Sequence, residues 1–419
     1  MLTIEDPELA QLANEPMPDR HWAHRLSQHP VLDLAFRSYF LLAVICSIVA
    51  LSFWSAYLNG YFTFSAGGLS PTTWHIHEML FGFAATVAVG FILTAAQTWT
   101  GKPSIKGLPL LTLIVIWLLV RVCLLINQPA YIYSAIALQT LWWFGSIIVF
   151  TRLVLSSQNR RNYIFIPLFI AMMLLNISLV VLDLHGDSEL SRHVARTSVL
   201  MFCLLMGVLG GRVIPFFTVS GAKLEPITIP QWLTPLLTLV SLLGVLVFFS
   251  SGFVKLPFTP AGLMVASGLL HIFRQSYWRS KATVNIPLLW SLHLSYFSLG
   301  LGLILLGGSY QTFDSFTPFI NFSHALHVIT IAAMGLMIFA MMCRVSLGHT
   351  GRALIANKLV PWIFFAIFLS AFTRVILPLF DLPLFALNSS AFLWLVAGVL
   401  FLKVYFPILI SKKVEKNFR

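Results

Sequence analysis

The chain has 419 residues, of which 58% are hydrophobic and only 10% are charged, and its mean hydropathy is +0.88. Soluble domains are about 25% charged, so this composition leaves too little polar surface and excludes a soluble globular protein. The formal net charge of +12 would suit a nucleic-acid-binding protein, but the cations gather in alternate loops between apolar stretches, which excludes that class.

Apolar stretches of about 20 residues recur along the chain, and each is long enough to cross about 30 Å of hydrocarbon as a helix. The expected spans are 36–58, 76–98, 107–126, 130–152, 162–184, 194–217, 229–250, 258–274, 286–307, 323–345, 360–379 and 384–408. Residues 1–35 form a polar tail without the apolar core of a signal peptide, and residues 409–419 form a basic tail. The fold class is therefore all-α, a polytopic membrane protein of about 12 transmembrane helices.

The lysine and arginine residues indicate how these helices are oriented. If the N-terminus is cytoplasmic, most of the 26 cations fall in the cytoplasmic tails and loops, whereas the opposite side holds only Arg192, Arg196 and Lys255. This asymmetry follows the positive-inside rule. It predicts that both termini are cytoplasmic and that the basic charge reflects topology, with no nucleic-acid partner.

A repeated pattern relates the second and tenth expected helices. His77 and His327 occupy equivalent positions near the two starts, and each helix is followed at the same distance by Thr-Gly and a cation, at 100–102 and 350–352. The sixth helix carries a weaker copy, in which Thr197 replaces the histidine. The pattern predicts three parallel four-helix repeats, at about 36–152, 162–274 and 286–408. This arrangement resembles the catalytic subunit of haem-copper oxidases, and the likeness concerns the fold alone.

Four histidines lie at the outer ends of the second and tenth helices. Two histidines on different helices can hold both axial positions of a haem, and His77 and His327 form the natural pair because they are equivalent in the repeat. His75 and His324 are then left to support that pair or to bind copper. A regular helix points His75 and His77 apart. The alternative is that these imidazoles only bond to headgroups or water at the membrane surface.

Two buried arginines support a site at this depth. Arg121 and Arg374 each lie about 14 residues into a helix that starts on the cytoplasmic side, which corresponds to about 21 Å of rise. An arginine there needs an anionic partner. Haem propionates would suit its forked donors, and Glu78 is the rival partner; the side chains could also snorkel or bind backbone carbonyls.

The cytoplasmic ends of several helices form a second cluster. Its members are Gly210, Gly211, Arg212, His271, Arg274, His293, Arg344 and His349. Paired glycines allow close approach of another helix or of a flat ligand. The cluster could therefore bind a second cofactor or an anion, or it could be the basic girdle of the cytoplasmic side with ordinary helix caps.

Four stretches resemble motifs of the NnrS family of haem- and copper-binding bacterial membrane proteins. They are WHIHEMLFGF at 74–83 with WTG at 99–101, GGRVIPFFT at 210–218, LHLSY at 292–296 and RVSLGHTGR at 344–352. The resemblance implies an inner-membrane protein that binds haem of the b type and copper and acts in the nitric oxide response, often alongside denitrification. The residues that it implies for these sites are His75, His77, Glu78, Arg212, His293, His327, Arg344 and His349, with His324 and His271 outside the pattern.

Three functions follow as hypotheses. The first is binding of nitric oxide or its metal adducts at a histidine-ligated haem, which relieves nitrosative stress. The second is a redox enzyme acting on nitric oxide or quinol, and the third is a transporter of copper, haem or a small solute. The sixth and seventh expected helices contain no histidine, which argues against an oxidase-type binuclear centre. The sequence leaves open whether the protein catalyses any turnover.

Overall fold

The computed structural model describes residues 26–310 and 321–414, and it is all-α within them, as predicted. Eleven helices of this part are long and apolar enough to cross a membrane. The long helical elements are α3 (Ala35–Leu58), α4 (Pro71–His77) with η2 (Glu78–Ala84) and α5 (Ala85–Thr100), α6 (Gly107–Ile126), α7 (Pro129–Ser156), α8 (Phe165–Leu184), α9 (Ser188–Ala222), α10 (Leu233–Ser251), α11 (Ala261–Ser276), α12 (Pro287–Gly308), α13 (Phe322–His327) with η5 (Val328–Gly335) and α14 (Leu336–His349), α15 (Val360–Ile376) and α16 (Pro383–Ile410).

Every expected span corresponds to one of these helices. The span expected at 258–274 is α11, whose 16 residues make it shorter than the other eleven. Short 3₁₀ turns join the helices: η1 (Pro30–Leu32), η3 (Arg160–Asn162), η4 (Ser280–Thr283) and η6 (Leu377–Phe380). Of the expected tails at 1–35 and 409–419, residues 1–25 and 415–419 fall outside the described residues.

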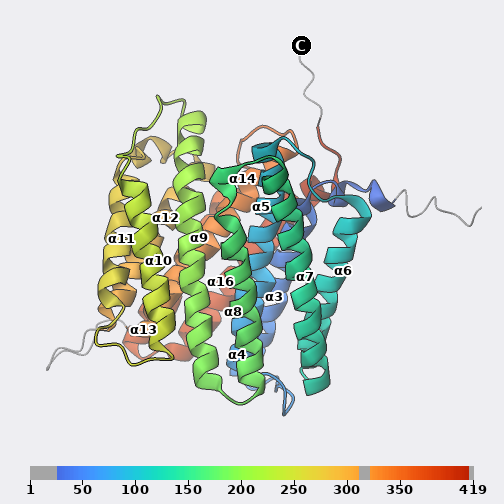
Figure 1. Cartoon of the computed structure of the whole chain (residues 1–419), viewed down its shortest axis with the longest axis vertical. Helices are drawn as coiled ribbons and strands as arrows, with labels where there is room; N and C mark the ends of the chain where they lie inside the picture. Colours follow the sequence, from blue (N-terminus) through green and yellow to red (C-terminus); the bar gives the residue numbers. More distant parts are fainter. Residues whose placement is uncertain (1–25, 311–320, 415–419) are drawn as a thin grey trace, which may run out of the picture.

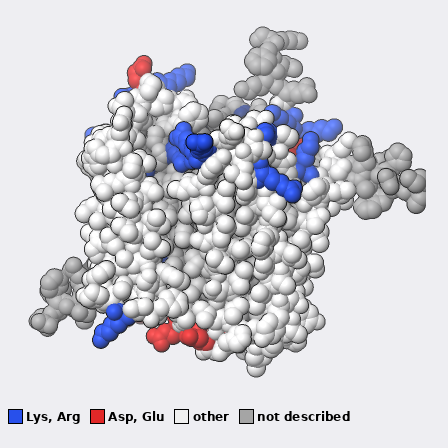
Figure 2. Space-filling view, viewed as in Figure 1, with Lys and Arg blue, Asp and Glu red and all other residues white. Residues whose placement is uncertain are grey.

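The helices run roughly parallel in one bundle, with α6 and α7 on one flank and α10 and α11 on the other (Figure 1). Figure 2 shows an uncharged belt across the middle of the molecule, and most of the visible Lys and Arg lie at the end from which the C-terminal segment leaves. A bilayer accounts for both features. That this end faces the cytoplasm remains a prediction.

The helix contacts follow the same order three times along the chain. The first helix of each expected group packs on the second, in the pairs α3–α5, α8–α9 and α12–α14, and the third packs on the fourth, in the pairs α6–α7, α10–α11 and α15–α16. Neighbouring groups meet through α7–α8, α11–α12 and α16–α3. The bundle therefore closes into a ring. The boundaries of the three repeats remain a prediction.

The helices that carry His77 and His327 share an unusual backbone conformation. A π-helical segment follows His77 directly, as η2, and another follows His327 directly, as η5. π-Helical turns are rare and occur frequently at functional sites. The two helices are therefore alike in conformation as well as in sequence, at the positions where the site was expected.

Candidate functional site

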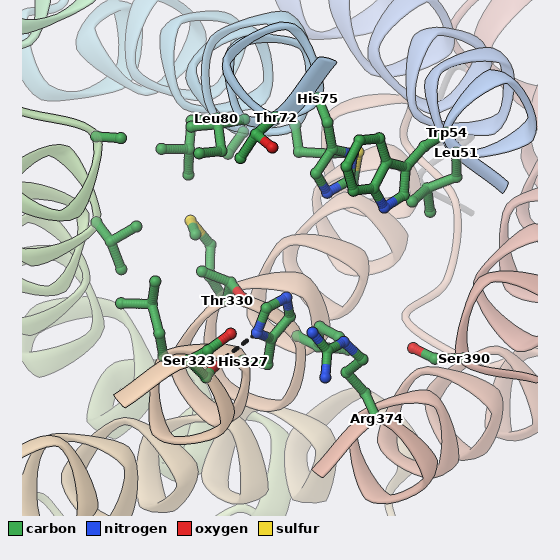
Figure 3. Close-up of a pocket in the computed structure, with 18 of the residues that line it drawn as sticks. Leu51, Trp54, Thr72, His75, Leu80, Ser323, His327, Thr330, Arg374 and Ser390 are labelled. Atoms are coloured by element: carbon green, nitrogen blue, oxygen red, sulfur yellow. Dashed lines mark hydrogen bonds between the residues drawn. The ribbon is translucent and has the colours of Figure 1, made fainter. Parts of the chain in front are cut away.

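A cavity of about 360 Å³ opens among the ends of α3, α4, α9, α13, α15 and α16 (Figure 3). The ionisable side chains among the described residues that line it are two histidines and three arginines: His75, His327, Arg192, Arg196 and Arg374. No Asp or Glu occurs among the described residues that line it. The cavity is therefore suited to a ligand that carries negative charge and takes nitrogen donors.

His75 enters this cavity from α4. The helix begins at Pro71 and is capped by Ser70, whose Oγ accepts from the backbone N–H of Thr73 at 3.3 Å. The His75 ring stacks on Trp54 with centroids 4.4 Å apart and planes at 13°. Its Nδ1 is buried and has no hydrogen-bond partner among the described residues. The ring is thus held in place by stacking, while one nitrogen stays free.

His327 reaches the same space from the opposite wall (Figure 3). Its Nδ1 lies 2.6 Å from the carbonyl oxygen of Ser323. Because a carbonyl can only accept, Nδ1 carries the proton and Nε2 keeps its lone pair. Metal-binding histidines are usually held in this way. His324, one turn away on α13, has a buried Nδ1 without a partner but does not line the cavity.

The cavity arginines have no acidic partner in the described part of the chain. Both ion pairs of that part involve Glu78, which lies elsewhere. Arg374 extends from α15 towards the space between the two histidines (Figure 3). The Arg196 guanidinium lies over the Phe322 ring, 4.7 Å from its centroid. Their charge is therefore available to an anionic ligand.

His77 does not face His327, contrary to the pairing expected from the repeat. Residues two positions apart in a helix are separated by about 200° around its axis. The side chain of His77 therefore leaves the helix on the far side from His75. Its Nδ1 lies 3.1 Å from Oε1 of Glu78, and Arg121 Nη1 lies 3.1 Å from the same oxygen. Glu78 also accepts from Cys46 Sγ at 3.3 Å. Of the two partners considered for Arg121, the structure gives it Glu78.

The second cluster expected from the sequence is filled by the protein's own side chains. A Cβ added at Gly207, Gly210 or Gly211 would meet His271, Tyr296 or Arg274, respectively. His271 Nδ1 lies 2.7 Å from the Tyr296 hydroxyl, and Arg274 donates to that hydroxyl and to a carbonyl of α9. The glycines therefore admit neighbouring helices, and the space beside them is not left for a flat ligand.

The other expected residues of that cluster also have partners within the described part of the protein. Both ring nitrogens of His293 are engaged, by Thr218 and Ser280 at 2.8 Å each. Arg212 donates to Asn162 at 2.8 Å, the Arg344 guanidinium lies 4.1 Å from the ring centroid of Phe217, and the ring centroids of His349 and Phe36 lie 5.7 Å apart. No group of three or more His, Cys, Asp or Glu in residues 26–310 and 321–414 is placed to hold a metal ion.

Several cavity residues were not singled out from the sequence. Arg192 and Arg196 were assigned only to the topology, yet their spacing of four residues places them on one helix face, which was an available signal. Met79, Met334 and Trp54 also line the cavity. Nothing in their local sequence separates them from ordinary packing residues of apolar helices.

Comparison with known proteins identifies a matching family. The model of the NnrS family, described as NnrS protein, matches residues 30–413, which is nearly the whole chain. No curated protein matches the chain.

Proposed function

The chain belongs to the NnrS family, and we propose that its cavity binds a haem between His75 and His327. Membership of the family supports a role in the nitric oxide response. The observation that carries the proposal is the cavity itself, where two imidazoles face one space that three arginines surround and no described carboxylate enters.

The donor set fits a haem. His75 Nδ1 has no partner among the described residues, and the hydrogen bond of His327 to Ser323 leaves the lone pair of Nε2 for a metal. Arg374 and Arg196 would pair with the propionates, since guanidinium groups bind carboxylates in a forked geometry. A volume of about 360 Å³ lies in the range of cofactor sites. A haem held there would supply an iron centre able to bind nitric oxide.

Copper is a second ligand supported by a specific observation. The thioethers of Met79 and Met334 line the same cavity as His75 and His327, and soft sulfur with imidazole suits Cu(I). His324 could join only if its ring turned towards the cavity. We propose copper as an alternative occupant, because haem alone accounts for the arginines.

We favour binding over catalysis as the role of the site. Reduction of nitric oxide consumes protons, and histidines, carboxylates and tyrosines are the groups that usually deliver them. Among the described residues that line the cavity, His75 and His327 are the only groups of these kinds, and in the proposed site both bind the iron. We place the protein in the bacterial inner membrane with both termini in the cytoplasm, on the basis of the loop charges. The redox and transport functions remain as alternatives.

The test is the absorption spectrum and metal content of detergent-purified protein. We expect a Soret band in the wild type that is lost in His75→Ala and in His327→Ala. His77→Gln is the matched control, because it is two residues away yet points out of the cavity, and it should keep the band. Each variant must elute as a single species with unchanged helical circular dichroism.

Other results would contradict the proposal in different ways. Loss of the band in His77→Gln with retention in His75→Ala would restore the pair expected from the repeat. Copper without haem, lost in Met79→Leu, would favour the alternative occupant. A colourless, metal-free wild type after expression with haem and copper supplied would exclude both.

A further inference from the structure

A second, much smaller cavity lies on the far side of the helix that carries His75. It measures about 10 Å³ and sits between α4, α6, α7 and α8. Its polar lining consists of His77, Gln139 and Asn176, and the remaining lining side chains are aliphatic. It shares no lining residue with the large cavity, so the following argument does not depend on the proposed function.

Two amide groups at this cavity have a donor left over. Gln139 Oε1 accepts from Arg121 Nη2 at 2.9 Å, and Asn176 Oδ1 accepts from Trp143 Nε1 at 3.1 Å. These bonds fix which end of each amide is oxygen. The opposite ends, Gln139 Nε2 and Asn176 Nδ2, are buried and have no partner among the described residues.

His77 contributes an acceptor to the same space. Its Nδ1 faces the carboxylate of Glu78 at 3.1 Å, which can only accept, so this nitrogen carries the proton. The charge of Glu78 is already balanced by Arg121, and a neutral imidazole keeps the whole group neutral within the membrane. Nε2 of His77 therefore keeps a lone pair, and no hydrogen bond to it occurs in the described structure.

Two unused donors and one unused acceptor thus belong to residues that line a cavity of about 10 Å³. Buried polar groups without partners are costly. A cavity of about 10–15 Å³ with two to four polar partners suits one water molecule. We propose that this cavity binds one water, which accepts hydrogen bonds from Gln139 and Asn176 and donates one to His77 Nε2.

The site selects a small, neutral molecule that both donates and accepts hydrogen bonds. A cation would meet two amide donors, and an anion would meet the lone pair of His77. With the water in place, both ring nitrogens of His77 are engaged. The residue therefore supports the Glu78–Arg121 pair, and it is not free to bind iron or copper.

Infrared spectroscopy of the oxygen–hydrogen stretch tests the proposal, because exchange into H₂¹⁸O shifts the bands of water alone. We expect a narrow band of an ordered water in the wild type that shifts with ¹⁸O and disappears in Asn176→Leu and in Gln139→Leu. Gln97→Leu is the control, because Gln97 lies in α5 and does not line this cavity. Its Oε1 accepts from the backbone N–H of Ser104. This variant should keep the band.

A density map that resolves ordered waters provides an independent check on the wild type, which needs no variant to fold. A peak within hydrogen-bond distance of His77 Nε2, Gln139 Nε2 and Asn176 Nδ2 is the expected result. An empty cavity in such a map overturns the proposal. So does an ¹⁸O-sensitive spectrum in which Asn176→Leu, folded and helical, matches the wild type.

Discussion

Where α11 and α12 cross, two glycines face each other. A Cβ on Gly268 would lie 2.5 Å from the carbonyl oxygen of Gly300, and a Cβ on Gly300 would lie 2.9 Å from the carbonyl oxygen of Gly268. Both clashes involve main-chain atoms, which cannot turn aside as a side chain could. The close contact of these two helices therefore depends on the absence of side chains at one crossing point.

We expect Gly268→Ala to destabilise the protein by about 1–3 kcal/mol, the usual cost of overpacking. Gly262→Ala is the matched control on the same helix, because a Cβ there meets no atom within 4 Å. It should be neutral or slightly stabilising, since alanine favours helix over glycine. Thermal unfolding in detergent compares the two, and equal melting temperatures would contradict the importance of the crossing.

The direction of individual histidine side chains could not be predicted from the sequence. The sequence predicts His77 and His327 as the haem-binding pair, because they occupy equivalent positions in the repeat. Equivalence in sequence, however, does not fix the direction of a side chain. His75 and His77 lie about 200° apart around the helix axis, and which of them faces the cavity depends on how α4 is rotated against its neighbours. That rotation is not visible in an apolar stretch.

At the scale of the element, α4 is held at its start by a neighbouring helix. Asp183 at the end of α8 accepts from the backbone N–H of Ser70 at 2.7 Å and from its hydroxyl at 2.8 Å. Ser70 in turn caps α4. The direction of α4, and with it the position of His75, therefore depends on a carboxylate outside the cavity.

We expect Asp183→Ala to destabilise the protein by about 1–3 kcal/mol, because it leaves the half-buried donors of Ser70 without their partner, and to weaken retention of the cavity ligand. Asp187→Ala is the control: it also removes a helix cap, at the start of α9, with a cost of about 1 kcal/mol, but α4 is untouched. Ligand content per protein after size-exclusion chromatography distinguishes them. Equal retention would show that α4 is positioned without Asp183.

The length and composition of the apolar stretches were enough to predict the helices themselves. Each expected span has its helix, because about 20 apolar residues can satisfy their backbone in a bilayer only as a helix. Packing was less predictable. The choice between Glu78 and a propionate for Arg121 could not be made, and the glycines at 210 and 211 were compatible with a ligand as well as with Tyr296 and Arg274. Such choices depend on which helices are neighbours.

At the scale of the whole molecule, the ring closes where α3 meets α16. Nη1 of Arg37, which is 1% exposed, donates to the carbonyl oxygens of Leu409 and Ser411 at 3.0 and 2.6 Å. At the other end of the seam, the amides of Asn59 and Asn388 bond to each other in both directions, at 2.8 and 3.1 Å. The first and last described helices are thus joined at both ends.

We expect Arg37→Met to destabilise this seam by about 1.5–3 kcal/mol, the range for hydrogen bonds to a charged group. Its signature should be local, with faster proteolysis near the end of α16. Arg352→Met is the control, because its bond to Ser411 Oγ at 2.8 Å comes from a half-buried loop and should matter less. If both variants resist protease as the wild type does, the seam is held by its apolar contacts alone.

The closed ring has a consequence for the gene. In an open row of helices, the first and last elements each have an unpaired side, and the order of synthesis decides which elements those are. Here α3 and α16 are neighbours like any other adjacent pair. A circularly permuted gene that joined the end of α16 to the start of α3 by a linker and opened the loop between α7 and α8 would therefore encode the same helix contacts.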